Sequence, residues 1–207
     1  MDLIIHHRSC PDGFCAAFVA KKRFPEAEVL ALDHGGFLPT GAVEGKDVLV
    51  VDCSWRTRED NILLSELAKS FRILDHHKTA QAVLEGLDFA RFDMERSGAG
   101  LAWDYLFGID SSELVHPNGL FIKHEPTWRT YPRPWYVDYV EDRDLWRHAL
   151  PDSHEVYAFI MTLPFTFEAW SVLDEMSPTD ALVKGSGAQS QVDHYVREAI
   201  SKRNPAI

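Results

Sequence analysis

The feature that most constrains the fold is a series of short apolar segments separated by stretches in which apolar residues recur with helical spacing. Short apolar segments that lack polar alternation are typical of strands buried on both faces of a parallel sheet. Such segments lie at 3–5, 29–32, 48–51 and 71–74, with a further short strand expected at 89–92. Right-handed crossovers place the connecting helices on both faces of such a sheet. The sequence therefore predicts an α/β fold with a mainly parallel central sheet flanked by helices.

The rest of the chain favours helices. Helical spacing is found at 14–21, 62–68, 100–106, 135–150, 154–161, 167–173 and 181–202. The segment 108–133 is interrupted by prolines and is expected to be a loop or an insertion. We expect a domain over 1–180 and a linker-like helix over 181–207. The aromatic residues between 135 and 146 favour core packing over a base-stacking platform.

Three of the apolar segments are followed by potential metal ligands, namely His6, Asp52 and Asp75. Asp12 lies in the loop after the first segment, and His76 follows Asp75 directly. Ligands bind at the carboxyl ends of strands in open parallel sheets, so these side chains are expected to converge on one edge. The pattern predicts a metal site at that edge.

Carboxylate oxygens and imidazole nitrogens together suit Mn²⁺, Mg²⁺, Fe²⁺ or Zn²⁺. Asp52 could bridge two cations ~3.5–4 Å apart, and a hydroxide formed between such ions attacks phosphorus in line. Structural interpretations stay open as well. Asp52 could cap the following helix, His6 and Asp12 could form a turn with a helix cap, and His76 and His77 could be a solvated pair.

Four segments together resemble the motifs of the DHH phosphoesterase superfamily. They are 6–13, 50–52, 74–78 and 141–146, so the resemblance spans most of the chain. This superfamily includes single-strand exonucleases, oligoribonucleases, phosphatases acting on adenosine bisphosphate, cyclic-dinucleotide phosphodiesterases and manganese pyrophosphatases. The resemblance implies a catalytic domain that holds two divalent cations, most often Mn²⁺.

The resemblance also implies a role for each matching residue. His6 would bind one cation and Asp12 the other, with Asp52 bridging them. His76 would bind the second cation together with a residue of the last motif, Asp142, with Asp144 and Asp138 as competitors. Asp75 would be a ligand or would orient a histidine ring. His77 would lie near the substrate phosphate, so that Asp52, His76 and His77 carry the catalytic role.

The chain departs from the superfamily pattern in two respects. Cys10 stands where an aspartate is usual; a thiolate at this site favours Zn²⁺ or Fe²⁺ over Mg²⁺, unless the sulfur does not bind metal. We expect no counterpart of the usual C-terminal substrate-binding domain after the helix expected at 181–202. Substrate selection would then depend on 108–133 or on another subunit.

Further residues are candidates for binding phosphate. The turn at Ser97 and Gly98 opens a helix, whose free N–H groups could bind an anion, although a plain tight turn is an equal alternative. Lys78 and Arg96 are cationic candidates, but each is also compatible with an ordinary surface charge.

The composition limits which kinds of binding partner and which cellular location can be expected. The net charge of −11 and the pI of about 5.3 argue against a protein that coats long duplex nucleic acid, but not against an enzyme acting on nucleotides. The three cysteines form no disulfide pattern, and neither a signal peptide nor a membrane span is expected. We therefore expect a cytoplasmic protein, and a homodimer is left open.

The sequence thus predicts a metal-dependent hydrolase of phosphodiester bonds in short oligonucleotides or nucleotide-derived substrates. Alternatives are a phosphomonoesterase or pyrophosphatase acting on a small substrate, and a degenerate domain that binds nucleotides without turnover. A structural zinc protein is disfavoured, because clustered carboxylates outnumber thiolates.

Overall fold

The computed structural model describes residues 1–33, 36–108, 132–188 and 190. The chain forms two compact units, Met1–Arg133 and Pro134–Ile207. This division falls at the end of the proline-interrupted segment, whereas the sequence places a boundary after residue 180. Whether 1–180 acts as one catalytic domain stays a prediction, and most of the expected insertion at 108–133 lies outside the described residues.

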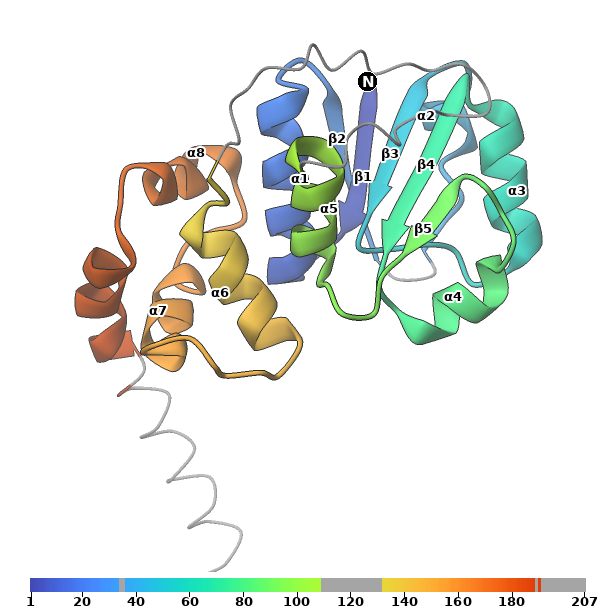
Figure 1. Cartoon of the computed structure of the whole chain (residues 1–207). Helices are drawn as coiled ribbons and strands as arrows, with labels where there is room; N and C mark the ends of the chain where they lie inside the picture. Colours follow the sequence, from blue (N-terminus) through green and yellow to red (C-terminus); the bar gives the residue numbers. More distant parts are fainter. Residues whose placement is uncertain (34–35, 109–131, 189, 191–207) are drawn as a thin grey trace, which may run out of the picture. The chain divides into compact units, whose positions relative to one another are not determined.

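The first unit is built on a five-stranded sheet with the order β2-β1-β3-β4-β5 (Figure 1). Each pair of neighbouring strands is parallel, which confirms the predicted α/β fold class. The strands are β1 (Leu3–His7), β2 (Glu28–Leu32), β3 (Asp47–Val51), β4 (Ser70–Asp75) and β5 (Ala90–Phe92). The chain leaves β1 toward β2 on one side and returns to β3 on the other. The carboxyl ends of β1 and β3 therefore flank a topological switch point, where ligands bind in sheets of this kind.

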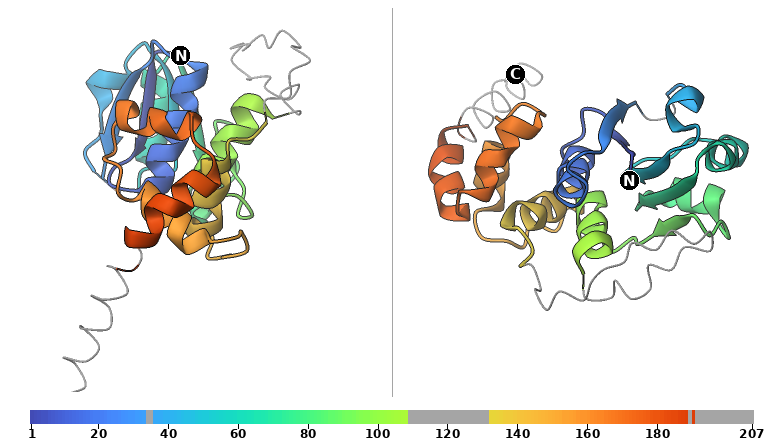
Figure 2. Two further views of the ribbon diagram at one scale, coloured as in Figure 1. Left: turned by 90° about the vertical axis from the view of Figure 1, so that its left-hand side faces the viewer. Right: turned by 90° about the horizontal axis from the view of Figure 1, so that it is seen from above.

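Helices cover the sheet on two sides (Figures 1 and 2). On one face α1 (Pro11–Arg23) and α5 (Gly98–Phe107) pack against each other and against the strands. The other face packs under α2 (Thr40–Val43), α3 (Arg58–Leu67) and α4 (Lys78–Leu84).

Strand residues alternate between the two faces because successive side chains of a strand point in opposite directions. One hydrophobic cluster joins the strands to α2, α3 and α4; its buried members include Ile5, Val50, Ile73, Leu64 and Leu84. Ile4, Leu49 and Leu74 alternate with the strand members of that cluster, and each is fully buried. Burial on both faces explains why these strands are apolar throughout.

The second unit is helical in its described part. It contains α6 (Trp135–Asp144), α7 (Ser153–Ile160), α8 (Phe167–Trp170), the 3₁₀ helix η2 (Ser171–Asp174), and a helix at 178–188. The helix expected over 135–150 ends at Asp144, because Trp146 and His148 have φ angles of 54° and 47°, which no α-helix accommodates. The last part of the helix expected at 181–202 lies outside the described residues.

The aromatic residues of α6 and of the turn that follows it divide into two groups. Tyr136 and Tyr139 are buried and belong to the core of the second unit, as the sequence predicts. Trp146 is 73% exposed, so the core assignment is wrong for this residue. Its position beyond the end of α6, in a left-handed backbone conformation, removes it from the buried face of that helix.

Two further expectations concern the whole chain. The described helices include none with the length and apolar character that a membrane span needs. Cys10, Cys15 and Cys53 are free thiols.

Candidate metal centre

Asp52 lies at the centre of the candidate site, immediately after β3 at the switch point of the sheet. Its backbone has a φ angle of 57°, in the left-handed region that few residues other than glycine, asparagine and aspartate adopt. Backbone strain of this kind is concentrated at functional sites. The conformation ends the strand and sets the direction of the carboxyl group.

The carboxyl group of Asp52 is buried without a hydrogen-bond donor. The residue is 1% exposed, and neither carboxylate oxygen has a hydrogen-bond partner among the described residues. Burial, followed by the nearby charge of Asp12, raises the pKa of Asp52 to about 8. Buried polar atoms are nearly always paired, and the charged partner available to this carboxyl group is the imidazole of His76, whose Nε2 lies 3.2 Å from it.

Two groups of potential ligand atoms share Asp52. One group consists of His7, Cys10 and Asp52, and the other of Asp52, His76 and His77; within each group the ligand atoms lie within 4.8 Å of one another. The Nε2 atom of His76 lies 3.2 Å from an oxygen of Asp52, outside hydrogen-bond geometry, and 3.6 Å from an oxygen of Asp12. A carboxylate shared by two groups is the arrangement expected of a residue that bridges two cations.

The structure places His7, and not His6, beside Asp52. The Nδ1 atom of His7 lies 4.0 Å from the Asp52 carboxylate. The ring of His6 packs edge-on against Phe14 of α1 at 5.8 Å, and its Nδ1 donates to the carbonyl of His7. Burial lowers the pKa of His6 to about 4, so its ring is neutral. Metal binding by His6 stays a prediction, and His7 is an additional candidate that the sequence analysis did not select.

Cys10 lies in the same group as His7 and Asp52, at the residue preceding α1. Burial, followed by the charge of Asp52, raises the pKa of its thiol to about 12. The thiol is therefore protonated at neutral pH in the metal-free protein. Binding of a soft cation would displace this proton, as it does at other thiolate ligands.

Asp12 connects α1 to α5. Its two carboxylate oxygens accept the backbone N–H groups of Gly98 at 2.6 Å and of Ala99 at 2.9 Å. The hydroxyl of Ser97 accepts the N–H of Gly100, so the first N–H groups of α5 are already paired. This pairing leaves them unavailable to a phosphate, and the geometry does not support the phosphate contact expected at Ser97 and Gly98.

Two glycines allow the chain to approach Asp52 closely. A Cβ atom on Gly98 would lie 2.5 Å from the Cβ of Asp52, and one on Gly13 would lie 2.9 Å from the Oδ2 of Asp52. Real Cβ atoms do not approach other heavy atoms so closely, so both positions require glycine for the observed packing. Gly13 and Gly98 therefore allow Asp52 to take the position that it has in the site.

Asp75 is fully buried at the end of β4 and accepts several hydrogen bonds. Its donors are the hydroxyl of Ser54 at 3.2 Å, the backbone N–H groups of His76 and His77, and Nδ1 of His77 at 2.6 Å. Burial alone would raise the pKa of Asp75, but these donors outweigh it and lower the pKa. Of its two predicted roles, the geometry favours the residue that orients a histidine ring. The hydrogen bond between Asp75 and the ring of His77 also raises the pKa of His77.

The two cationic candidates, Lys78 and Arg96, also belong to the first unit. Lys78 is exposed at the start of α4, directly after His77. The guanidinium of Arg96 lies 3.1 Å from the carboxylate of Asp104, on α5. Arg96 is therefore engaged in an ion pair, and its predicted phosphate contact stays a prediction.

Asp142 lies in the second unit, on α6. Its carboxylate oxygens accept the N–H of Ala149 at 2.8 Å and the hydroxyl of Ser153 at 2.5 Å, and it is 4% exposed. These contacts tie the turn after α6 to the start of α7. The choice of metal ligand among Asp142, Asp144 and Asp138 stays open.

Sequence reasoning missed His7, Ser54 and the close approach of the two glycines. Strand alternation could have identified His7, because the neighbouring histidines of β1 must face opposite sides of the sheet. Ser54 carries no signal in the sequence, since its contact with Asp75 depends on the pairing of β3 with β4.

No protein-family model matches this chain. Its sequence is similar to that of the uncharacterised protein R106 of Acanthamoeba polyphaga mimivirus, with 25% identity over 227 aligned residues. The alignment covers 100% of this chain and 48% of that protein, so the chain spans about half the length of this relative. An uncharacterised protein from Helicobacter pylori G27 has a similar crystal structure, with a TM-score of 0.65 at 15% identity, over 93% of this chain and 61% of that one. This likeness supports the fold.

Proposed function

We propose that this chain is a metal-dependent phosphoesterase that hydrolyses phosphodiester bonds in short oligonucleotides or nucleotide-derived substrates. The single observation that carries the proposal is the carboxylate of Asp52. It is buried, it has no hydrogen-bond partner among the described residues, and it is shared by two groups of potential ligands at the switch point of the sheet. The resemblance of the surrounding motifs to the DHH phosphoesterases supplies the reaction class.

The residues around Asp52 fit a pair of divalent cations. The group with His76 and His77 offers carboxylate oxygen and imidazole nitrogen, which suit Mn²⁺. The group with His7 and Cys10 is softer, because it adds sulfur. Cations bound there would lower the pKa of a water molecule and neutralise charge on the phosphoryl oxygens.

The chain itself would position the substrate through His77. Its Nδ1 donates to Asp75, which is in turn held by Ser54, so the ring is fixed by a chain of two hydrogen bonds. The Nε2 atom lies on the opposite side of the ring from Asp75, and in the protonated ring it would donate to a phosphoryl oxygen. Its side chain is 37% exposed, so a substrate can reach it.

Asp12 would hold its oxygens in place through α5. The N–H groups of Gly98 and Ala99 favour its negative charge, and they are arranged before any ligand binds. A carboxylate oxygen that accepts one hydrogen bond retains a lone pair for a cation. The same helix therefore preorganises a ligand and, through Gly98, sets the position of Asp52.

The test is hydrolysis of a dinucleotide, adenosine bisphosphate, a cyclic dinucleotide and pyrophosphate in the presence of Mn²⁺, Mg²⁺, Zn²⁺ or Fe²⁺. We expect metal-dependent release of mononucleotide from the dinucleotide, and a loss of about 100-fold or more in kcat for Asp52→Asn and His76→Ala. Asp47→Asn is a matched control, because Asp47 is a buried aspartate at the opposite end of the same strand.

Several outcomes would contradict the proposal. Retention of more than about a tenth of the wild-type rate by either variant would remove Asp52 and His76 from the reaction. Turnover confined to pyrophosphate or adenosine bisphosphate would exclude a phosphodiester substrate. Ligand binding without turnover under all four metals would identify a degenerate domain.

A further inference from the structure

Trp146, in the second unit, is a large aromatic side chain held in place while most of its surface faces solvent. It is 73% exposed, although an indole ring buries a large apolar area when it packs in a core. The guanidinium of Arg143 lies over its ring, 4.8 Å from the centroid. The ring of His148 meets it edge-on, with centroids 5.6 Å apart at 84°. Two neighbours thus fix the orientation of a ring that remains accessible.

The backbone that presents Trp146 is strained. Trp146 and His148 both have positive φ angles, and for bulky residues such conformations are rare and cost roughly 1–3 kcal/mol each. The carbonyl of Asp142 accepts the N–H groups of Arg147 and His148, and its side chain accepts the N–H of Ala149. Asp142 therefore holds the strained turn. Strain maintained in this way at an exposed ring is typical of a binding site.

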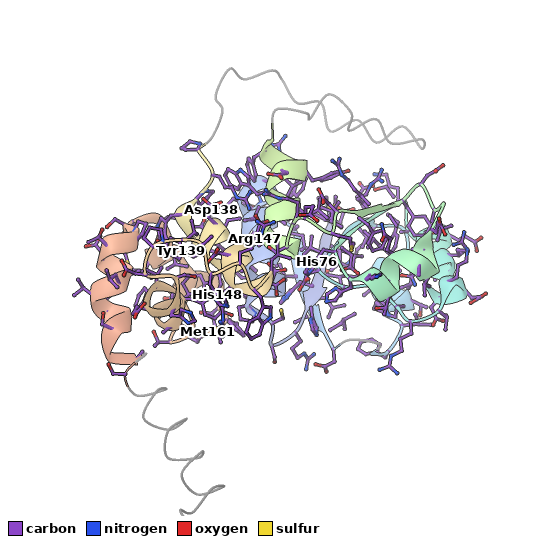
Figure 3. All side chains as sticks on the ribbon, turned by 60° about the horizontal axis from the view of Figure 1, so that its bottom comes forward. His76, Asp138, Tyr139, Arg147, His148 and Met161 are labelled. Atoms are coloured by element: carbon purple, nitrogen blue, oxygen red, sulfur yellow. The ribbon has the colours of Figure 1, made fainter. Side chains whose placement is uncertain are left out.

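Further rings extend the surface beside Trp146. His148 and His154 stack with centroids 4.7 Å apart and an interplanar angle of 8°. Arg143 also lies 5.8 Å from the centroid of the Tyr157 ring, and its Nη1 donates to Nε2 of His148 at 3.2 Å. Figure 3 marks His148 within the side chains of this unit. The cluster of Arg143, Trp146, His148, His154 and Tyr157 forms the Trp146 platform.

The charge of the platform indicates what it binds. Arg143 makes its contacts with rings and with His148, and no carboxylate pairs with it among the described residues. A ligand that combines a planar ring with negative charge suits this surface, since the ring can stack on the indole face that Arg143 does not cover and the positive charge of the guanidinium attracts an anion at longer range.

We propose that the Trp146 platform binds a nucleobase, which stacks on the face of the indole opposite Arg143. The identification of the ligand as a nucleotide rests on the proposed function. The inference that a planar anionic ligand stacks here rests only on the residues of the Trp146 platform. Stacking contributes affinity for every base, because each base has a π-face, so the platform would bind nucleotides with little sequence preference.

The test uses the full chain in the presence of a chelator, so that binding is measured without turnover. The probes are AMP and ribose 5-phosphate, which lacks the base, and the readout is isothermal titration calorimetry. We expect Trp146→Ala to weaken AMP binding by about 5- to 100-fold, the loss associated with one stacked base. Ribose 5-phosphate binding should not change, and Trp146→Phe, which keeps a ring, should retain AMP binding within a few fold.

Phe37→Ala is the matched control, because Phe37 is a 68% exposed aromatic residue of the first unit. Unchanged AMP binding by Trp146→Ala, or wild-type binding of AMP no tighter than that of ribose 5-phosphate, overturns the inference. Wild-type protein that binds AMP through Trp146 but hydrolyses nothing would overturn the proposed function and leave the stacking inference intact.

Discussion

The carboxylate of Asp12 accepts the backbone N–H of Gly98 at 2.6 Å, although 86 positions separate the two residues in the chain. Gly98 also packs against Asp52 so closely that a Cβ atom would lie 2.5 Å from the Cβ of that aspartate. One residue at the start of α5 therefore sets the positions of two candidate metal ligands. A substitution at Gly98 would therefore move the candidate ligands without removing any of their metal-binding atoms.

Gly98→Ala should impair the site without removing any ligand. The added methyl group must displace Asp52 or the start of α5, and overpacking of this kind costs about 1–3 kcal/mol. We expect lower thermal stability and a reduction of about tenfold or more in metal affinity, measured by calorimetry. Gly41→Ala is the control, since a Cβ there meets nothing within 4 Å. Equal metal affinity in the two variants would contradict the role given to Gly98.

Asp52→Asn should stabilise the metal-free protein while abolishing its response to metal. The carboxyl group lacks hydrogen-bond partners among the described residues, and asparagine tolerates the left-handed backbone at this position. We expect the free energy of unfolding in chelator to rise by about 1–3 kcal/mol, measured in urea. Added Mn²⁺ should stabilise the wild type but not the variant. A metal-free variant that is less stable than the wild type would show that the Asp52 carboxylate makes a stabilising interaction without metal, and would contradict this prediction.

His7→Ala and His6→Ala should have different effects. His7 lies beside Asp52, so its loss should weaken metal binding by about 10- to 100-fold. His6 packs against Phe14, so its loss should mainly lower stability, by about 1–3 kcal/mol. Calorimetric metal titration and urea unfolding distinguish these effects. If His6→Ala weakened metal binding as much as His7→Ala, the ligand implied by the family resemblance would be the correct one.

Cys10→Asp should change the metal preference of the site. A carboxylate is a harder ligand than a thiolate, so the variant should bind Mn²⁺ more tightly relative to Zn²⁺ than the wild type does. Competition titrations of the two metals measure this ratio directly. An unchanged ratio would indicate that the sulfur of Cys10 does not bind metal.

The contribution of Asp47 to stability should depend on pH. Burial alone would raise the pKa of its carboxyl group, but hydrogen bonds from Lys69 at 2.9 Å and Ser70 at 2.8 Å outweigh it and lower the pKa. A group whose pKa is lowered by folding binds more protons in the unfolded state, so its contribution is complete above the unfolded value and is lost as the pH falls through the folded value. Asp47→Asn should therefore cost about 1 kcal/mol near pH 6 and nothing near pH 2. Urea unfolding of both proteins across this range measures the difference, and a pH-independent cost would contradict it.

The strands β1, β3 and β4 were predictable because nearly all of their residues are buried, on both faces of the sheet. The segments at 48–51 and 71–74 correspond closely to β3 and β4, and no polar alternation obscured them. The convergence of Asp12, Asp52 and His76 followed from the parallel order of the sheet.

Other features depend on contacts between distant segments. The sequence left a phosphate contact and a plain tight turn as equal alternatives at Ser97 and Gly98; in the structure the N–H groups of Gly98 and Ala99 donate to Asp12 of a different helix. The end of α6 was missed because apolar residues at helical spacing continue through Trp146, whereas in the structure the backbone N–H groups of the following turn donate to Asp142. Helical periodicity does not identify such acceptors.

Cation binding at the buried carboxylate of Asp52, as proposed, would link the lifetime of this protein to its surroundings. A cation that binds only the folded chain shifts the folding equilibrium in proportion to the logarithm of its free concentration. When that concentration falls, more molecules open, and opened chains are the ones that proteases cleave. The abundance of the protein in a cell would then follow the supply of the ion, with no dedicated sensor to report it.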